Sequence, residues 1–188
     1  MQVSRELVER ARAGDREALE ALAVAVYGDV WRLLRSELAH EADAEDATQE
    51  TFREMVSSIR SLREPAAFAG WLYRIALDKA RHVRRAAAPP PASTEPQGGL
   101  TPMATLEREE TKVRVQHAVA ELDEDLRRTV RLRYEHALSY GEIAAAMQVP
   151  EGTVAWRLNA AHERLKRALA GAGVALAVHP RARGAEAA

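Results

Sequence analysis

Cysteine is absent from the 188-residue sequence, and long apolar runs are missing too. Without cysteine there are no disulfides, no thiolate catalysis and no cysteine-based zinc sites, so packing alone must hold any core. No apolar run approaches the roughly 20 residues that span a bilayer. The N-terminus, MQVSRELVERARAGDREAL, lacks the uninterrupted apolar stretch of a signal peptide. We therefore expect a cytoplasmic protein with no membrane insertion.

An excess of positive charge is also missing, because 27 basic residues face 28 acidic ones and the net charge is −1. A nucleic-acid role cannot be argued from overall charge, so it would have to lie in the distribution. Acidic residues gather between positions 41 and 50, and basic residues gather elsewhere, at Arg81, Arg84, Arg85, Arg127, Arg128, Arg131, Arg133, Arg157, Arg164, Lys166 and Arg167. This segregation suggests one surface for DNA and another for a protein partner, although solvated helix faces are the alternative.

A stretch rich in proline and glycine divides the chain. Residues 86–102, AAAPPPASTEPQGGLTP, contain five prolines and two adjacent glycines, which is typical of an extended linker. Residues 171–188 show no apolar periodicity and are expected to be a disordered tail. We therefore predict one domain at residues 1–85, a flexible linker at 86–103 and a second domain at 104–170.

Both predicted domains are all-α, because apolar residues recur at spacings of three and four and no window alternates as a strand would. In the first, Ser4 and Asp15 are expected to cap two helices separated at Gly14. A third helix begins near residues 43–46, and a fourth follows from about residue 66 to 85, so that a four-helix bundle results. Its predicted inward side chains are Leu19, Leu22, Val26, Val30, Leu33, Leu34, Phe52, Met55, Val56, Ile59, Phe68, Trp71, Leu72, Ile75 and Ala76.

The second domain is expected to hold helices around residues 105–121 and 123–135, followed by a helix-turn-helix. Ser139 and Glu142 have the spacing of a capping box at the start of the first helix of that pair. Pro150 suits the opening of the second helix. In that helix one face is apolar, formed by Val154, Leu158, Ala161, Leu165 and Leu169. An ordinary helical hairpin is the alternative, but a polar outward face favours DNA binding in the major groove.

The C-terminal stretch LSYGEIAAAMQVPEGTVAWRL resembles the sigma-four domain of extracytoplasmic-function sigma factors, which reads the promoter element near position −35. The preceding LDEDLRRTVRLRYEHALSY resembles that family's approach helix. Response regulators share this helix-turn-helix, so this half alone does not decide between the families. The resemblance implies that the upstream DNA is contacted by Ser139, Glu151, Thr153, Ala155, Trp156, Arg157, Asn159 and His162.

The N-terminal half favours the sigma factors. LVERARAGDREALEAL resembles their opening helices, and DAEDATQETFREM resembles their polymerase-docking helix. Asp46, Gln49 and Glu50 match positions that contact the coiled coil of the large polymerase subunit. A metal site is the competing interpretation of these carboxylates, but no histidine stands at ligand spacing. Solvated charge at a helix start is the other alternative.

SLREPAAFAGWLYRIALDKARHVRR resembles the segment of the sigma-two domain that melts and reads the promoter element near position −10. It combines aromatic edges, donors and positive charge on one helix, as capture of a single strand requires. Residues 63–66 correspond to a loop that holds an extruded base. Trp71 is ambiguous between core and DNA contact. The implied DNA-contacting set is Arg63, Phe68, Trp71, Tyr73, Arg74, Asp78, Lys79, Arg81, His82, Arg84 and Arg85.

The resemblance implies a specificity subunit that binds core RNA polymerase and promoter DNA, with an anti-sigma factor as a further partner and no cofactor, metal or catalytic residue. The family commonly has asparagine in place of Asp78, and basic residues in place of Ala155, Ala160 and His162, which leaves the promoter sequence open. A stand-alone helix-turn-helix regulator is the alternative. An enzyme is a weaker one, because no catalytic set or glycine-rich phosphate loop is present.

Overall fold

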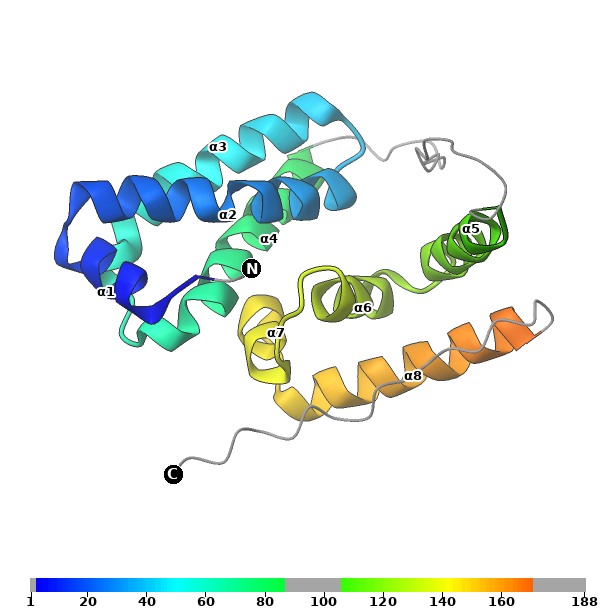
Figure 1. Ribbon diagram of the computed structural model, residues 1–188. Coiled ribbons are helices and arrows are strands. Elements are labelled where there is room, and N and C mark those ends of the chain that lie inside the picture. The colour runs from blue at the N-terminus through cyan, green and yellow to red at the C-terminus, as the bar shows by residue number, and fades with distance from the viewer. Residues whose placement is uncertain (1–2, 87–105, 171–188) are drawn as a thin grey trace. The chain divides into compact units, whose positions relative to one another are not determined.

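Two helical regions make up the computed structural model, which describes residues 3–86 and 106–170 (Figure 1). The predicted linker, apart from Ala86, and the predicted tail lie outside the described residues. The helices before the gap are α1 (Arg5–Ala13), α2 (Arg16–Glu37), α3 (Glu41–Ser58) and α4 (Phe68–Ala86), with short 3-10 turns η1 (Ile59–Ser61) and η2 (Pro65–Ala67) before α4. Those after it are α5 (Leu106–Ala120), α6 (Glu124–Tyr134), α7 (Tyr140–Met147) and α8 (Glu151–Leu169). The all-α prediction is confirmed.

Two compact units arise from the contacts, and their division does not follow the gap. One contains Met1–Glu95 and Arg131–Ala155, and the other contains Pro96–Val130 and Trp156–Ala188. Helices α6 and α8 therefore each pass from one unit into the other. In the parts of the chain that the structure describes, no helix is long and apolar enough to cross a membrane.

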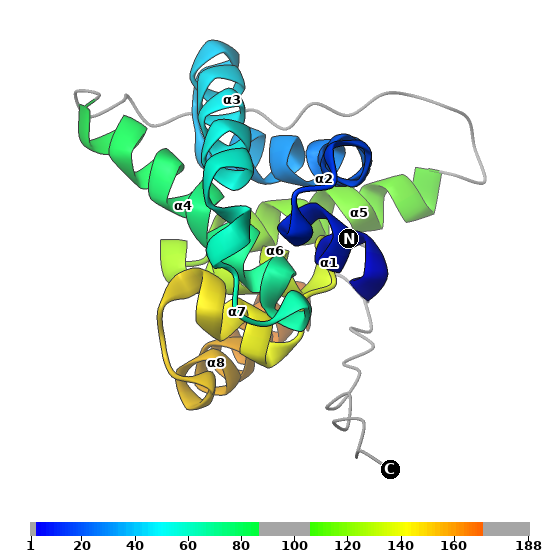
Figure 2. The same cartoon turned by 90° about the vertical axis from the view of Figure 1, so that its left-hand side faces the viewer.

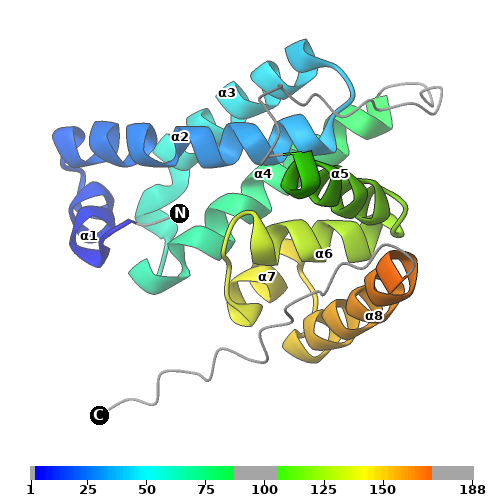
Figure 3. The same ribbon diagram turned by 45° about the vertical axis from the view of Figure 1, so that its right-hand side comes forward.

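The first unit is built on the antiparallel arrangement of α2, α3 and α4. Helices α2 and α3 run side by side (Figures 1 and 3), and α4 packs against both. Their shared core contains the fully buried Leu22, Val26, Val30, Leu33, Leu34, Met55, Leu72 and Ala76. Thr48 and Thr51 are also buried, and each hydroxyl donates to the carbonyl four residues earlier at 2.7 Å. The bonds satisfy hydroxyl groups that would otherwise be costly in the core.

The helix boundaries follow from capping side chains. Ser4 accepts a hydrogen bond from the amide of Leu7, and Asp15 accepts one from the amide of Ala18, as predicted. Gly14 ends α1 with φ of +95°, a conformation that favours glycine. Helix α3 begins at Glu41, earlier than predicted. The sequence did not reveal this start, because the N-cap residue His40 makes no side-chain capping bond.

Some predicted core positions are wrong. Val56 is 50% exposed, because it lies on α3 toward solvent beside the turn from α1 to α2. Leu19, Phe52 and Trp71 are only half-buried. Phe52 stacks on Tyr27 of α2 with ring centroids 5.7 Å apart, so its partner is a surface aromatic ring instead of the core.

The second unit has its own apolar face. Ala118 and Leu122 lie near the end of α5, Leu126 and Val130 lie on α6, and all four are buried. On α8, whose first residues up to Ala155 belong to the first unit, the predicted stripe is confirmed, since Val154, Leu158, Ala161, Leu165 and Leu169 are all buried. The helix therefore turns its opposite face outward.

The capping box at the start of α7 is present as predicted. The hydroxyl of Ser139 accepts a hydrogen bond from the amide of Glu142 at 3.3 Å, and the Glu142 carboxylate accepts one from the amide of Ser139 at 2.7 Å. These bonds satisfy two of the amides that a helix start leaves without partners.

Replacing Ser139→Ala should lower the free energy of unfolding by about 1 kcal/mol, because the amide of Glu142 loses its acceptor. Hydrogen exchange at that amide should accelerate in step. Ser57→Ala is the matched control, because Ser57 is exposed and its hydroxyl donates to the carbonyl of Glu54 near the end of its own helix, without capping a free amide. Equal exchange at the Glu142 amide in wild type and Ser139→Ala would contradict the capping assignment.

Candidate functional site

Helix α3 presents a polar face to solvent. Asp46, Gln49 and Glu50 are all exposed, whereas Ala47, Thr48 and Thr51 on the opposite side are buried. Arg53 lies one turn further on, where it pairs with Glu50 and donates to Gln49 at 3.3 Å. The structure thus brings the three predicted docking residues together on one face. Among the described residues, no group of three or more histidine, aspartate or glutamate side chains is arranged to hold a metal.

The sequence analysis did not single out two exposed apolar side chains of α2, one of which contacts α3. Val24 is 80% exposed and Tyr27 is 51% exposed, both on α2, and Tyr27 carries the stack with Phe52. Their exposure could have been predicted from the sequence, because neither residue falls at the helical spacing of the buried residues Leu22, Val26 and Val30. The combination of exposed aromatic and polar groups resembles a protein-binding surface more than a solvated face.

Helix α4 separates its apolar face from its cations. Phe68 is buried and lies 6.0 Å from the half-buried Trp71, measured between ring centroids. Arg63 is exposed in the turn before the helix. The exposed residues Arg81, His82, Arg84 and Arg85 follow in its last two turns. Aromatic rings near the start of α4 and basic residues near its end are the combination that the sequence predicted.

Several polar side chains of α4 are engaged with neighbouring helices or residues. Lys79 pairs with Glu54 of α3 at 2.6 Å, and Arg84 pairs with Glu37 of α2 at 3.3 Å. Asp78 accepts hydrogen bonds from Arg81 at 2.8 Å and from Gln148 at 3.4 Å. Arg74 is half-buried. These contacts fix the direction of the helix and hold its charged groups in place.

Tyr73, like Phe68, is a buried member of the predicted set. It is fully buried, and its hydroxyl shares a hydrogen bond of 2.9 Å with Nδ1 of His136, in the turn before α7. Helix α7 packs against α4 within the first unit (Figure 2). The contact is close because Gly70 has no side chain, and a Cβ there would stand 2.9 Å from the carbonyl oxygen of Glu142. In this arrangement, therefore, the Tyr73 side chain is not accessible to a ligand.

Burial is the main cause that lowers the pKa of His136 to about 4. The positive charges of Arg32 and Arg131 lower this pKa further, whereas the negative charge of Asp29 raises it by less than burial lowers it. Its Nε2 atom has no hydrogen-bond partner among the described residues. Burial also raises the pKa of Tyr73. Both groups are accordingly neutral at pH 7, and a charge on either one would be poorly solvated.

The helix-turn-helix is formed by α7 and α8. Gln148 ends α7 with φ of +56°, and Pro150 precedes α8, so the chain reverses within three residues. Gly141 of α7 approaches Glu151, whose Oε1 would lie 3.1 Å from a Cβ at that glycine. The first turns of α8 thus lie against α7, which is the geometry that places a recognition helix.

The predicted DNA-contacting residues occupy the outward side of this motif with different exposure. Glu151, Trp156, Asn159 and the capping residue Ser139 are exposed. Thr153, Ala155 and His162 are half-buried, and burial lowers the pKa of His162. Trp156 is 66% exposed, an unusual position for the largest side chain.

Arginines of α8 are held by acidic residues that the sequence analysis did not single out. Arg157 pairs with Asp125 at the start of α6, and its side chain is only 14% exposed. Arg164 pairs with Asp123. These pairs give the two arginines a packing role, and no spacing rule in the sequence links residues so far apart.

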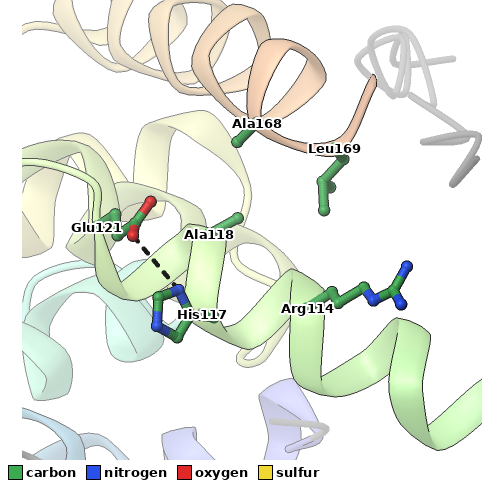
Figure 4. Close-up of a pocket in the computed structure, with 6 residues that line it drawn as sticks. All are labelled: Arg114, His117, Ala118, Glu121, Ala168 and Leu169. Atoms are coloured by element: carbon green, nitrogen blue, oxygen red, sulfur yellow. Dashed lines mark ion pairs between the residues drawn. The ribbon is translucent and has the colours of Figure 1, made fainter. Parts of the chain in front are cut away.

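A shallow pocket in the second unit lies between α5 and the end of α8 (Figure 4). His117 and Glu121 pair at 3.4 Å on one side, and Ala118 and Leu169 supply an apolar floor. The described lining contains one carboxylate, Glu121, and no hydroxyl or thiol group.

Comparison with known families resolves the ambiguity left by the helix-turn-helix. Residues 22–88 match the model of sigma-70 region 2, and residues 112–169 match that of sigma-70 region 4. The sigma-H factor of Pseudomonas aeruginosa is 31% identical over 178 residues, covering 87% of this chain and 92% of its own. The chain belongs to the extracytoplasmic-function sigma factors. It therefore directs transcription initiation, and the stand-alone regulator is not favoured.

Other relatives agree with this assignment. The sigma-E factor of Escherichia coli K12 is 35% identical over 173 residues, covering 85% of this chain and 90% of its own. Among solved structures, CnrH in complex with the cytosolic domain of CnrY matches with a TM-score of 0.64 and 25% identity, covering 90% of this sigma factor and 98% of that chain. RpoE of Bartonella quintana, solved with the anti-sigma factor NepR, has the same fold with a TM-score of 0.59 and 20% identity, covering 80% and 96%. Sigma factors in general are not enzymes.

Acidification should weaken the packing around His136. Its pKa in the folded chain is lowered, so the unfolded chain binds a proton first, and stability present above pH 6.5 is lost as pH falls toward about 4. Urea unfolding at several pH values should show this loss in wild type and a smaller one in His136→Gln, which does not titrate. Identical pH dependence in both proteins would contradict the assignment.

Proposed function

We propose that residues 1–85 act as the sigma-two domain and residues 104–170 as the sigma-four domain, joined by residues 86–103. The observation that carries this division is the order of the two region matches on either side of a stretch rich in proline. In this scheme one domain docks on core polymerase and opens the promoter, while the other holds the duplex upstream. Neither domain makes or breaks a bond, because polymerisation belongs to the core enzyme.

Docking is assigned to the exposed face of α3 that carries Asp46, Gln49 and Glu50. The face is polar and rich in carboxylate, and Arg53 already orients Gln49 and Glu50. An acidic, pre-ordered surface suits a partner that supplies basic and amide groups. The stacked pair of Tyr27 and Phe52 adds an apolar neighbour, which gives the interface area as well as charge.

Strand capture is assigned to the turn at Arg63, to Trp71 and to the cationic end of α4. Phosphates are negatively charged and bases present flat faces, so an aromatic ring followed by arginines suits a single strand. The residues assigned are those predicted from the sequence: Arg63, Phe68, Trp71, Tyr73, Arg74, Asp78, Lys79, Arg81, His82, Arg84 and Arg85. Tyr73 can join them only when the segment around His136 moves away from it.

Upstream duplex binding is assigned to α8 and the start of α7. Free amides at the start of a helix favour phosphate, and Thr153 lies in that first turn. The outward residues assigned to this contact are Ser139, Glu151, Thr153, Ala155, Trp156, Arg157, Asn159 and His162. Because Arg157 is paired with Asp125, it would support DNA binding by holding α8 in position. It would contact DNA directly only where DNA displaces that carboxylate.

An anti-sigma factor is a further partner in this proposal. CnrH was solved with the cytosolic domain of CnrY, and a chain of the same fold was solved with an anti-sigma factor, which supports the idea. Such a partner would act by covering the polymerase-binding face of α3. The proposal also places this sigma factor in the cytoplasm, where core polymerase is found, and assigns it no cofactor.

The decisive test is transcription with core polymerase over a pool of genomic fragments, with and without this sigma factor. Discrete new transcripts should appear only when both proteins are present. Alignment of their start regions would then give the promoter motif. Absence of any transcript that depends on the sigma factor would overturn the proposal.

Asp46→Arg should weaken binding to core polymerase at least tenfold, since it reverses a charge on the docking face. Fluorescence titration of labelled sigma factor with core measures this, and circular dichroism checks the fold. Glu9→Arg is the control, because Glu9 is an exposed carboxylate of α1 outside the docking face. Undiminished affinity of Asp46→Arg would reject the docking assignment.

Trp71→Ala should weaken holoenzyme binding to a forked DNA with a single-stranded −10 element by about tenfold, the value of one lost base stack. Binding to a duplex that carries only the upstream element should be unchanged, which makes that DNA the internal control. An equal loss on both DNAs would point to a folding defect, and no loss on either would remove Trp71 from the captured-strand site.

A further inference from the structure

Trp156 is a large apolar side chain of α8 that is exposed, and its position is favourable for reading DNA. It is the sixth residue of the helix, in the second turn from the end that enters the major groove. Single exposed apolar residues are common on protein surfaces, so exposure alone decides nothing. The surroundings of the side chain are more informative.

Space is available on the side toward which the Trp156 side chain leans. Helical side chains point back toward the N-terminus and cover the turn before their own Cα atom. One turn before Trp156 stands Gly152, and a Cβ at that glycine would meet nothing within 4 Å. No side chain therefore stands over that turn, and a partner can approach Trp156 from it.

The positive charges near Trp156 are already engaged. Arg157 is largely buried and pairs with Asp125, and Arg164 pairs with Asp123. Ala155 carries no polar group, so the outward side of these two turns offers Thr153 and Asn159 as its neutral hydrogen-bonding side chains. Hydrogen-bond readout by arginine, the commonest specific contact with guanine, is therefore not provided at this point of the helix.

We propose that Trp156 is a specificity-determining residue that contacts the 5-methyl group of a thymine in the upstream promoter element. Thymine alone presents an apolar group in the major groove, and large or small apolar side chains recognise it. The inference rests on the proposed function of α8 and adds to it the base that one residue selects. Discrimination here is by apolar contact, and Asn159 one turn further on supplies the adjacent hydrogen bonds.

The test uses holoenzyme and the duplex promoter found by the transcription experiment. Each thymine of the upstream element is replaced in turn by uracil, which removes the methyl group and nothing else. At one position this should weaken binding of wild-type holoenzyme about fourfold, the value of burying one methyl group. With Trp156→Ala, the same replacement should change binding less than 1.5-fold, by the logic of a double-mutant cycle.

Two controls keep the outcome interpretable. Val113→Ala removes an exposed apolar side chain from α5, outside every surface assigned to polymerase or DNA, and should retain the full uracil effect. Core binding measured without DNA should be equal for wild type and Trp156→Ala, so a failure of the sigma-factor function itself is seen separately. The proposal is overturned if no uracil position matters, or if the uracil effect is as large in Trp156→Ala as in wild type.

Discussion

The burial of one face of α4 is the constraint on which the rest of the first unit depends. Leu72 and Ala76 of α4 are fully buried, and burial of a side chain the size of leucine contributes about 1.5–3 kcal/mol. That packing sets the rotation of the helix. Because the rotation is fixed, Trp71 stays at the surface, and the arginines of the last turns extend from one defined end of the helix.

Charge is distributed by pairing as well as by clustering. The chain has a net charge of −1, yet its cations are placed where helices meet, as with Lys79 and Glu54, or Arg157 and Asp125. The carboxylate of each pair is exposed to solvent, and ion pairs that solvent reaches contribute little to stability. Their main effect is geometric, because they decide which cations face solvent and which hold one helix against another.

Much of the architecture could be predicted from the sequence, because local rules govern it. Caps at Ser4, Asp15 and Ser139, and the apolar stripe of α8, depend only on neighbouring residues. The contacts that could not be predicted join residues distant in sequence. Tyr73 has the spacing and chemistry of a DNA contact, but its burial depends on His136, 63 positions away. The same holds for Arg157, whose acidic partner lies 32 positions earlier. Val56 shows the opposite error, since an apolar residue at helical spacing lies at a margin that no other element covers.

A single hydrogen atom sets how near α7 can come to α4. At Gly70 the hydrogen stands where any other residue would carry carbon, directly against the backbone of Glu142. Backbone cannot rotate aside as a flexible side chain does, so even alanine would force the two helices apart. Substitution is thus restricted at position 70 for a reason unrelated to DNA or polymerase. A glycine retained there among homologues would indicate close helix contact, and it should not be read as a sign of a ligand site.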